Sequence, residues 1–187
     1  MRPDSSGLSL PWQGLVAGAV GGFVASWAME RFQARLSQTA GDGLDAAQRR
    51  SGHASTWSAR TQDQASGQPR PATVQTADVA ATATAGRRLS PTEQEVAGPL
   101  MHYGFGIAVG AVYGALAETR PELTRFGGVP FGLGVWASAD EVAVPAAGLS
   151  AAPWDRPLRA HSYSMLSHAV YGLTTEAVRK MVRSRLR

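Results

Sequence analysis

Four apolar blocks that carry almost no charge dominate this chain and limit the folds open to it. The first block, Leu8–Met29, has 22 residues without Asp, Glu, Lys or Arg. At a rise of about 1.5 Å per residue, a helix of this length crosses a hydrocarbon core about 30 Å thick. The other blocks cover residues 99–117, 127–149 and 161–178. We therefore expect an all-α integral membrane bundle of four transmembrane helices, the first extending over residues 8–32.

Two alternatives to this fold are open. A soluble helical bundle rich in Gly and Ala is disfavoured, because Gly destabilises soluble helices but is common in membrane helices. A cleaved signal peptide at the first block is disfavoured, since the bulky Trp27 interrupts the small-residue pattern of a cleavage site. The chain has no Cys, which excludes disulfides and thiolate ligands. Its net charge is a modest +4, its Arg residues are scattered except at the C-terminus, and no basic surface interleaved with aromatic residues is evident, so no nucleic-acid partner is expected.

A long polar segment, residues 33–89, separates the first two blocks. Residues 33–98 contain only six Leu, Ile, Val or Phe. Such a composition buries too little apolar surface to offset the entropy lost on ordering, so we expect a low-complexity, mostly disordered insertion. Ser90 and Glu93 then form a capping-box pattern, which predicts a short helix leading into the second span, with Pro99 kinking or restarting it. Residues 90–178 thus contain this helix and the three later spans.

Basic residues predict the orientation of the bundle. They cluster in residues 179–187 and in the short loop that holds Arg120 and Arg125. Lys and Arg close to membrane spans favour the cytoplasmic side, and an even number of spans places both termini on that side. We expect an N-in and C-in protein that contacts the lipid bilayer and whose basic tail, residues 179–187, binds anionic lipid headgroups.

Small residues recur at four-residue steps in three of the blocks, and each run ends in Glu. Positions four apart share a helix face, and Gly at those positions lets two helix backbones approach closely. Helices in lipid gain no hydrophobic driving force from one another, so we expect them to pack along these ladders. Ladders left without a partner inside the chain favour a homo-oligomer. The ladder glycines are Gly14, Gly18, Gly22, Gly106, Gly110, Gly114 and Gly172, and the terminal acids are Glu30, Glu118 and Glu176.

Ionisable side chains fall inside the blocks and at their ends. A carboxylate at the centre of a bilayer is costly, so it must be neutral, paired or open to water. We expect His168 to partner Asp140 or Glu141 near the midplane. Pro145 leaves the carbonyl of Glu141 without its helical donor and adds a polar spot there. The predicted polar intramembrane cluster consists of His168, Asp140, Glu141, Glu176, Glu118, His102, His161 and Glu30.

Two functions fit this cluster. In the first, the acids and histidines lock neighbouring helices of a packing or assembly protein. In the alternative, they form a proton or small-cation pathway or a pH-responsive switch. A membrane metal enzyme is disfavoured, because the inward Glu-x-x-His spacing of di-metal bundles is absent and His161 and His168 lie about 10 Å apart along a helix. We expect no catalytic residues, no metal site and no cofactor.

Several short motifs resemble a known family. They are the run from Trp27 to Glu30, Tyr113 with Gly114, the span of Asp140 and Glu141, and the run from Ser167 to Glu176. Together they are similar to the YagU-like family of bacterial inner-membrane proteins, a domain of unknown function. The resemblance covers Gly14–Arg31 and the chain from Leu100 onward, but not the insertion. It implies a multi-pass protein of the bacterial inner membrane without an established catalytic activity, and it assigns no role to the acidic pair.

Overall fold

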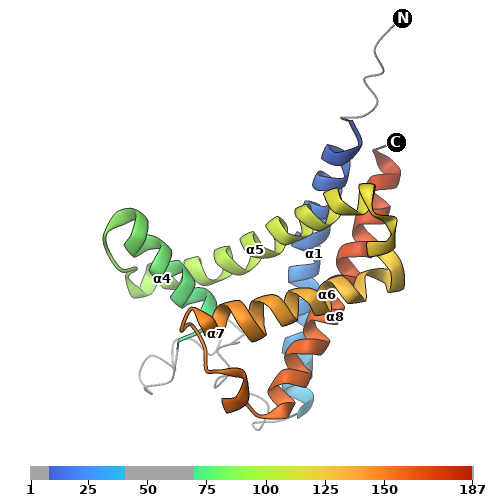
Figure 1. The fold of residues 1–187 in the computed structure, drawn as a ribbon. Helices are drawn as coiled ribbons and strands as arrows, with labels where there is room; N and C mark the ends of the chain where they lie inside the picture. The colour runs from blue at the N-terminus through green and yellow to red at the C-terminus, as the bar shows by residue number, and fades with distance from the viewer. Residues whose placement is uncertain (1–8, 41–69, 187) are drawn as a thin grey trace, which may run out of the picture. The chain divides into compact units, whose positions relative to one another are not determined.

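The described part of the chain is built from helices. The computed structural model describes residues 9–40 and 70–186, and no strand occurs among them, which confirms an all-α fold for these residues. Three long helices are α1 (Ser9–Ala40), α5 (Pro91–Thr119) and α8 (Leu158–Arg185) (Figure 1). The shorter elements are α4 (Ala72–Ala85), the 3₁₀ segment η3 (Pro121–Gly128), α6 (Val129–Val135), the π-helix η4 (Trp136–Ala143), α7 (Val144–Ala146) and the 3₁₀ turn η5 (Pro153–Asp155).

The chain divides into two compact units. The first unit consists of Met1–Met29, Tyr103–Gly134 and His168–Arg187. The second consists of Glu30–His102 and Val135–Ser167. Each unit is therefore assembled from segments that lie far apart in the sequence.

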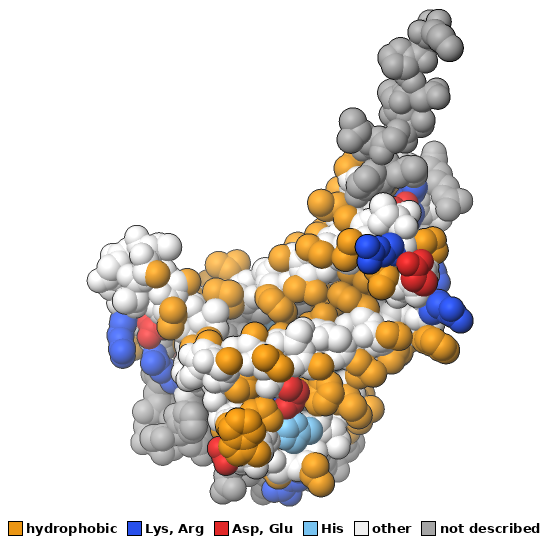
Figure 2. Space-filling view, viewed as in Figure 1, with side chains coloured by type: hydrophobic (Ala, Val, Ile, Leu, Met, Phe, Trp, Pro, Cys, Tyr) orange, Lys and Arg blue, Asp and Glu red, His pale blue; other side chains and the backbone are white. Residues whose placement is uncertain are grey.

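Small and polar residues fill the interior of the first unit, and large apolar residues cover its outside. On α1, Ala17, Ala25 and Ser26 are at most 1% exposed, whereas Trp12 and Phe23 are 52% and 51% exposed. A protein interior in water normally has the opposite composition, with the large aliphatic and aromatic side chains inside. Hydrophobic side chains also lie over α5 and α6 on the face that Figure 2 shows. The large apolar side chains thus face the surroundings of this unit.

Helix α5 begins at the predicted capping box. The N–H of Ser90 donates to Glu93 Oε2 at 2.8 Å, and the N–H of Glu93 lies 3.4 Å from Ser90 Oγ. The helix then continues through Pro99 to Thr119, so the helix does not restart at Pro99, and the alternative, a kink there, stays a prediction. Among the described helices, α5 alone is long and apolar enough to span a membrane by length and composition. This criterion thus supports one of the four expected spans.

The segment 33–89 contains more helix than its composition predicts. Helix α1 continues to Ala40, and Ala72–Ala85 form α4, while residues 41–69 lie outside the described residues. Alanine has the highest helix propensity of all residues, and α4 is rich in it. Gly86 ends the helix at φ +68°, where its N–H donates to Thr82 O. The expectation of disorder counted large apolar residues only and left helix propensity out.

Asp78 ties α4 to the start of α5. Its carboxylate accepts hydrogen bonds from the N–H of Leu89 at 2.8 Å and from Arg70 Nη1 at 3.1 Å. The Leu89 hydrogen bond is the main cause that lowers the pKa of Asp78 below its ordinary value of 3.8, while burial opposes this effect and Arg70 reinforces it.

This lowered pKa makes the Asp78 contact sensitive to acid. The contact stabilises the fold fully above pH 3.8 and is lost as the pH falls through the lower, folded pKa. We expect the amide chemical shift of Leu89 to titrate with a midpoint below that value, and Asp78→Asn to abolish the titration. A midpoint at or above the ordinary value contradicts the assignment.

The third predicted span, residues 127–149, is not one regular helix. It begins in the turn that ends η3 and passes through α6 into the π-helix η4. There the N–H of Val144 donates to Ala139 O, five residues earlier. Pro145 itself lies in α7, and just beyond it the N–H of Ala147 donates to Ala143 O, four residues earlier. The free carbonyl expected at Glu141 stays a prediction.

Helix α8 extends through the residues expected to form a basic tail. It runs from Leu158 to Arg185, beyond the predicted span of 161–178. Arg179 and Arg183 are 7% and 9% exposed. These two cations therefore face the interior of the first unit, whereas Lys180 and Arg185 are exposed, and lipid binding by the tail stays a prediction.

Candidate functional site

Three glycine pairs bring α1 and α5 into backbone contact within the first unit. In the central pair, a Cβ atom on Gly18 would lie 2.1 Å from the carbonyl oxygen of Gly110. Only glycine permits such an approach, so the two backbones touch directly. The partners ascend by four along α1 and descend by four along α5, so the two segments run antiparallel and keep one face in contact. The flanking pairs are Gly14 with Gly114 and Gly22 with Gly106.

A second glycine contact joins η3 and α6 to α8 in the same unit. A Cβ on Gly132 would lie 2.0 Å from His168 O, and one on Gly128 would lie 2.5 Å from Gly172 O. Gly172, one of the predicted ladder glycines, therefore packs against Gly128 and Gly132, which were not among the predicted packing residues. Gly128 and Gly132 show the same four-residue spacing, but they lie at the start of a block that was interpreted through its acidic pair.

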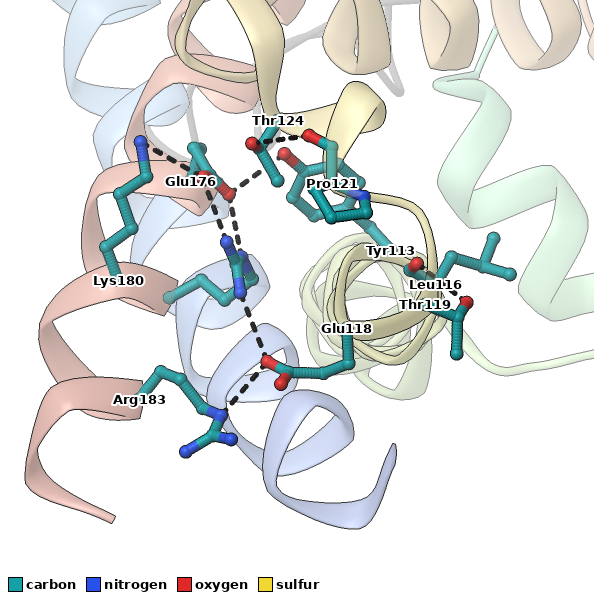
Figure 3. A network of polar contacts seen from close by, with 10 residues as sticks. Tyr113, Leu116, Glu118, Thr119, Pro121, Thr124, Glu176, Lys180 and Arg183 are labelled. Carbon is teal, nitrogen blue, oxygen red and sulfur yellow. Dashed lines mark hydrogen bonds and ion pairs between the residues drawn. The ribbon is translucent and has the colours of Figure 1, made fainter. Parts of the chain in front are cut away.

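Two ladder-ending glutamates meet arginines of α8 inside the first unit (Figure 3). Glu176 is 1% exposed, and its carboxylate accepts hydrogen bonds from Arg179 Nε at 2.7 Å, from Arg179 Nη2 at 3.0 Å and from the hydroxyl of Tyr113 at 2.9 Å. Glu118 accepts a hydrogen bond from Arg183 Nε at 3.0 Å, and Arg179 Nη1 lies 3.4 Å from the same carboxylate. Arg179 therefore links the acid of α5 to the acid of α8.

Charge and aromatic packing both stabilise this network. Lys180 Nζ lies 3.3 Å from Glu176 Oε1, so three cations face the two carboxylates. The ring of Tyr113 stacks on Phe131 with centroids 4.1 Å apart. Phe131 in turn packs on a small apolar cluster of Ala25, Met29 and Tyr171. Buried charges with this degree of compensation hold helices in one arrangement, because displacing either helix leaves a charge unpaired.

The second unit pairs the acids of the π-helix with other partners. Glu141 Oε2 lies 2.5 Å from Arg156 Nη2, and its Oε1 lies 3.0 Å from His161 Nδ1. The other ring nitrogen of His161 lies 2.9 Å from Pro153 O. The imidazole therefore lies between the carboxylate of Glu141 and the backbone carbonyl of Pro153. Glu141 therefore has two partners from the chain around the start of α8.

Asp140 is buried beside Ser164 in the second unit. The hydroxyl of Ser164 donates to Asp140 Oδ2 at 2.5 Å. Nearby on α8, the hydroxyl of Tyr163 donates to the backbone carbonyl of Gln33 at 3.1 Å. Serine and tyrosine hydroxyls thus satisfy buried acceptors that would otherwise be costly.

The remaining predicted cluster residues have less defined roles. His168 is 7% exposed, and its predicted partnership with Asp140 stays a prediction. Glu30 and His102 are partly exposed, and each takes part in a polar interaction. The structure brings Glu118 and Glu176 into one network and Glu141 and His161 into another.

The sequence analysis missed the three arginines that neutralise these acids, Arg156, Arg179 and Arg183. Glu176, Arg179 and Arg183 are spaced three and four residues apart, which places them on one face of a continuous helix. That signal was present, but the drop in hydropathy after residue 178 was taken as the end of the helix. No local pattern marks Arg156 as the partner of Glu141.

The described residues contain no group of three His, Asp or Glu side chains placed to hold a metal ion. The networks have instead the chemistry of ion pairing and hydrogen bonding. In the first unit they cross-link α5 and α8, while glycines join α1 to α5 and α6 to α8.

The comparisons with known proteins identify a family but no activity. A family model described as "Protein of unknown function (DUF1440)" matches residues 46–177, which is more than half of the chain. The match includes residues 46–89 of the insertion, which the resemblance based on motifs had left out, and it starts after the first apolar block. No curated protein matches the chain, and no solved structure does.

Proposed function

Since the chain belongs to the DUF1440 family of proteins of unknown function, we propose a role from its geometry. The proposed role is that of an integral membrane protein whose helices are held together by glycine contacts and enclosed ion pairs. In this proposal the chain packs and assembles helices, and the charged networks are structural.

This proposal rests on where the polar and the apolar side chains of the first unit lie. Glu176, Arg179 and Thr175 are buried, while Val112, Phe105 and Met181 are at least half exposed. Keeping a large apolar side chain in water forgoes about 1.5–3 kcal/mol of burial free energy. In lipid the same exposure is favourable, and the polar groups must be enclosed by protein. A bilayer therefore accounts for both halves of the pattern.

Average hydropathy understates the membrane character of α1 and α8. Both helices are longer than the roughly 20 residues that a span requires, with 32 and 28 residues. An average taken over a whole helix counts the enclosed polar face together with the outer face. On α8 the enclosed face contains Glu176, Arg179 and Arg183, whereas Leu166 and Leu173 are exposed. The lipid-facing side alone is apolar.

The type of membrane, the orientation and the number of spans are proposed from the sequence. The resemblance to the YagU-like family favours the bacterial inner membrane. The positive residues near the ends of the blocks favour N-in and C-in, with four spans. A homo-oligomer remains part of the proposal, because large apolar side chains such as Trp27 and Val20 are exposed on α1 and can pack on a second copy as well as on lipid.

The alternative proton or small-cation pathway fits the first unit less well. Glu118 and Glu176 each face arginine cations at hydrogen-bond distance. Both carboxylates are therefore engaged by side chains of the chain itself, and Glu118 is bound by arginines of a second helix. The observed pairing therefore supports a packing role over conduction.

Membrane fractionation of the full-length chain tests the proposal. We expect the protein to stay in the membrane pellet after alkaline carbonate washing and to enter solution only with detergent. Reporter fusions at Glu122 and Arg187 should report the cytoplasmic side, and a fusion at Gln64 the opposite side. Release by carbonate without detergent contradicts membrane integration, and a cytoplasmic reporter at all three positions contradicts the proposed topology.

A further inference from the structure

The turn between α5 and α6 holds an aromatic residue in an unfavourable backbone conformation. Phe126, Gly127 and Gly128 have φ values of +55°, +64° and +83° in succession. Glycine adopts this region freely, but for a bulky residue a positive φ is a genuine outlier. Phe126 is the only residue other than glycine with a positive φ among those the structure describes.

The glycine contact with α8 explains the path of the backbone. A Cβ on Gly128 would lie 2.5 Å from Gly172 O and 2.8 Å from Glu176 Cβ, so the chain must reach α8 with no side chain at this position. The turn that achieves this contact directs Phe126 away from the unit, and the residue is 78% exposed. A strained residue held outward is a reason to look for an external partner.

The residues next to Phe126 indicate what kind of external partner this turn fits. Arg120 and Arg125 are exposed on the same connection, and Leu123 is 37% exposed between them. Glu122 is the only acid on this connection. An aromatic ring and an aliphatic side chain flanked by two arginines match the boundary of a bilayer, where rings enter the acyl region and guanidinium groups meet phosphates. In Figure 2 charged side chains gather where this connection lies, next to the apolar surface of α5 and α6.

We propose that the α5–α6 connection is an anionic-lipid site, in which Phe126 and Leu123 enter the membrane surface and Arg120 and Arg125 bind phospholipid phosphate groups. This inference rests on the proposed membrane location of the chain.

Fluorescence quenching by labelled lipids tests the site. The chain contains no Cys, so Leu123→Cys provides a single point for a fluorophore. The labelled full-length protein is placed in phosphatidylcholine vesicles that contain either phosphatidylglycerol or phosphatidylcholine with a quencher near the top of the acyl chain. We expect stronger quenching by the phosphatidylglycerol quencher. A basic residue near an anionic membrane surface strengthens binding about fivefold, so Arg120→Gln with Arg125→Gln should lower the preference roughly 25-fold.

Two further variants separate charge and packing effects. Arg88→Gln with Arg159→Gln removes two exposed charges elsewhere and should leave the preference unchanged. Phe126→Gly relieves the strained φ and removes the ring, so quenching by both lipids should weaken without loss of thermal stability. If Phe126→Gly lowers stability instead, the ring packs against the protein and the proposal is overturned.

A fluorophore at Val112→Cys distinguishes this inference from the proposed function. Val112 is 60% exposed on α5, and a membrane location predicts quenching there by a label deep in the acyl chain. Deep quenching at Val112 with no quenching at Leu123, or with equal quenching by both lipids, overturns the lipid site and leaves the membrane location intact. Absence of quenching at both positions overturns both.

Discussion

Gly110→Ala is expected to destabilise the protein by about 1–3 kcal/mol, the usual cost of overpacking a close contact. The added Cβ would lie 2.5 Å from Gly18 O and 2.7 Å from Gly22 Cα, and both are backbone atoms that cannot move independently. The helices α1 and α5 must therefore separate in the first unit. The measurement is the midpoint of denaturant unfolding for the full-length protein in detergent micelles, followed by circular dichroism.

Gly104→Ala provides the matched control in the same helix. A Cβ at Gly104 meets no atom within 4 Å. Replacing glycine by alanine in a helix gains about 0.5–1 kcal/mol where no contact intervenes, so this variant should be neutral or more stable. The two substitutions should therefore change the stability in opposite directions. Equal effects at Gly104 and Gly110 mean that the glycine pairs do not hold the helices together.

Glu176→Gln is expected to be strongly destabilising, by about 3–5 kcal/mol, because it leaves buried cations without their main counter-charge. Arg179 makes two hydrogen bonds to Glu176 and has a side chain only 8% exposed. Thermal unfolding in detergent measures the loss. Glu122→Gln, an exposed acid on the α5–α6 connection, removes the same charge and should change stability little.

A double substitution distinguishes charge from packing at this network. Arg179→Met removes the stranded cation but keeps a flexible side chain of similar length. If the loss in Glu176→Gln comes from the unpaired charge, then adding Arg179→Met should restore much of the stability, with a coupling energy between the two sites. No recovery in the double variant contradicts the role assigned to the ion pair.

Helix faces could be predicted from the sequence, but their partners could not. A spacing of four places Gly14, Gly18 and Gly22 on one face whatever surrounds them. The register that sets Gly18 against Gly110 depends on the tertiary arrangement, and local spacing contains no information on it. The same limit applies to Glu141, whose partner Arg156 lies 15 positions away across an irregular connection.

Two differences from expectation have a common physical cause. Hydropathy was used to decide where helices end, at residue 32 for the first and at residue 178 for the last. Helix α1 continues to Ala40 and α8 to Arg185, because hydrogen bonding and side-chain pairing extend a helix beyond its apolar part. Polar residues such as Arg183 and Gln33 lie on these extensions and are buried. The three- and four-residue spacing of buried positions continues through these polar ends, so it predicts the ends of the helices better than hydropathy does.

The environment of the outward apolar side chains decides whether these helices lie in a membrane. Spin labels on Val20→Cys and Val112→Cys, both on exposed positions of long helices, can be measured in liposomes for collision with oxygen and with a water-soluble nickel complex. If these faces contact lipid, both labels should collide often with oxygen, which dissolves in lipid, and rarely with nickel. A label at Glu122→Cys should show the reverse. Frequent nickel collision at Val20 and Val112 would contradict the claim that these faces contact lipid.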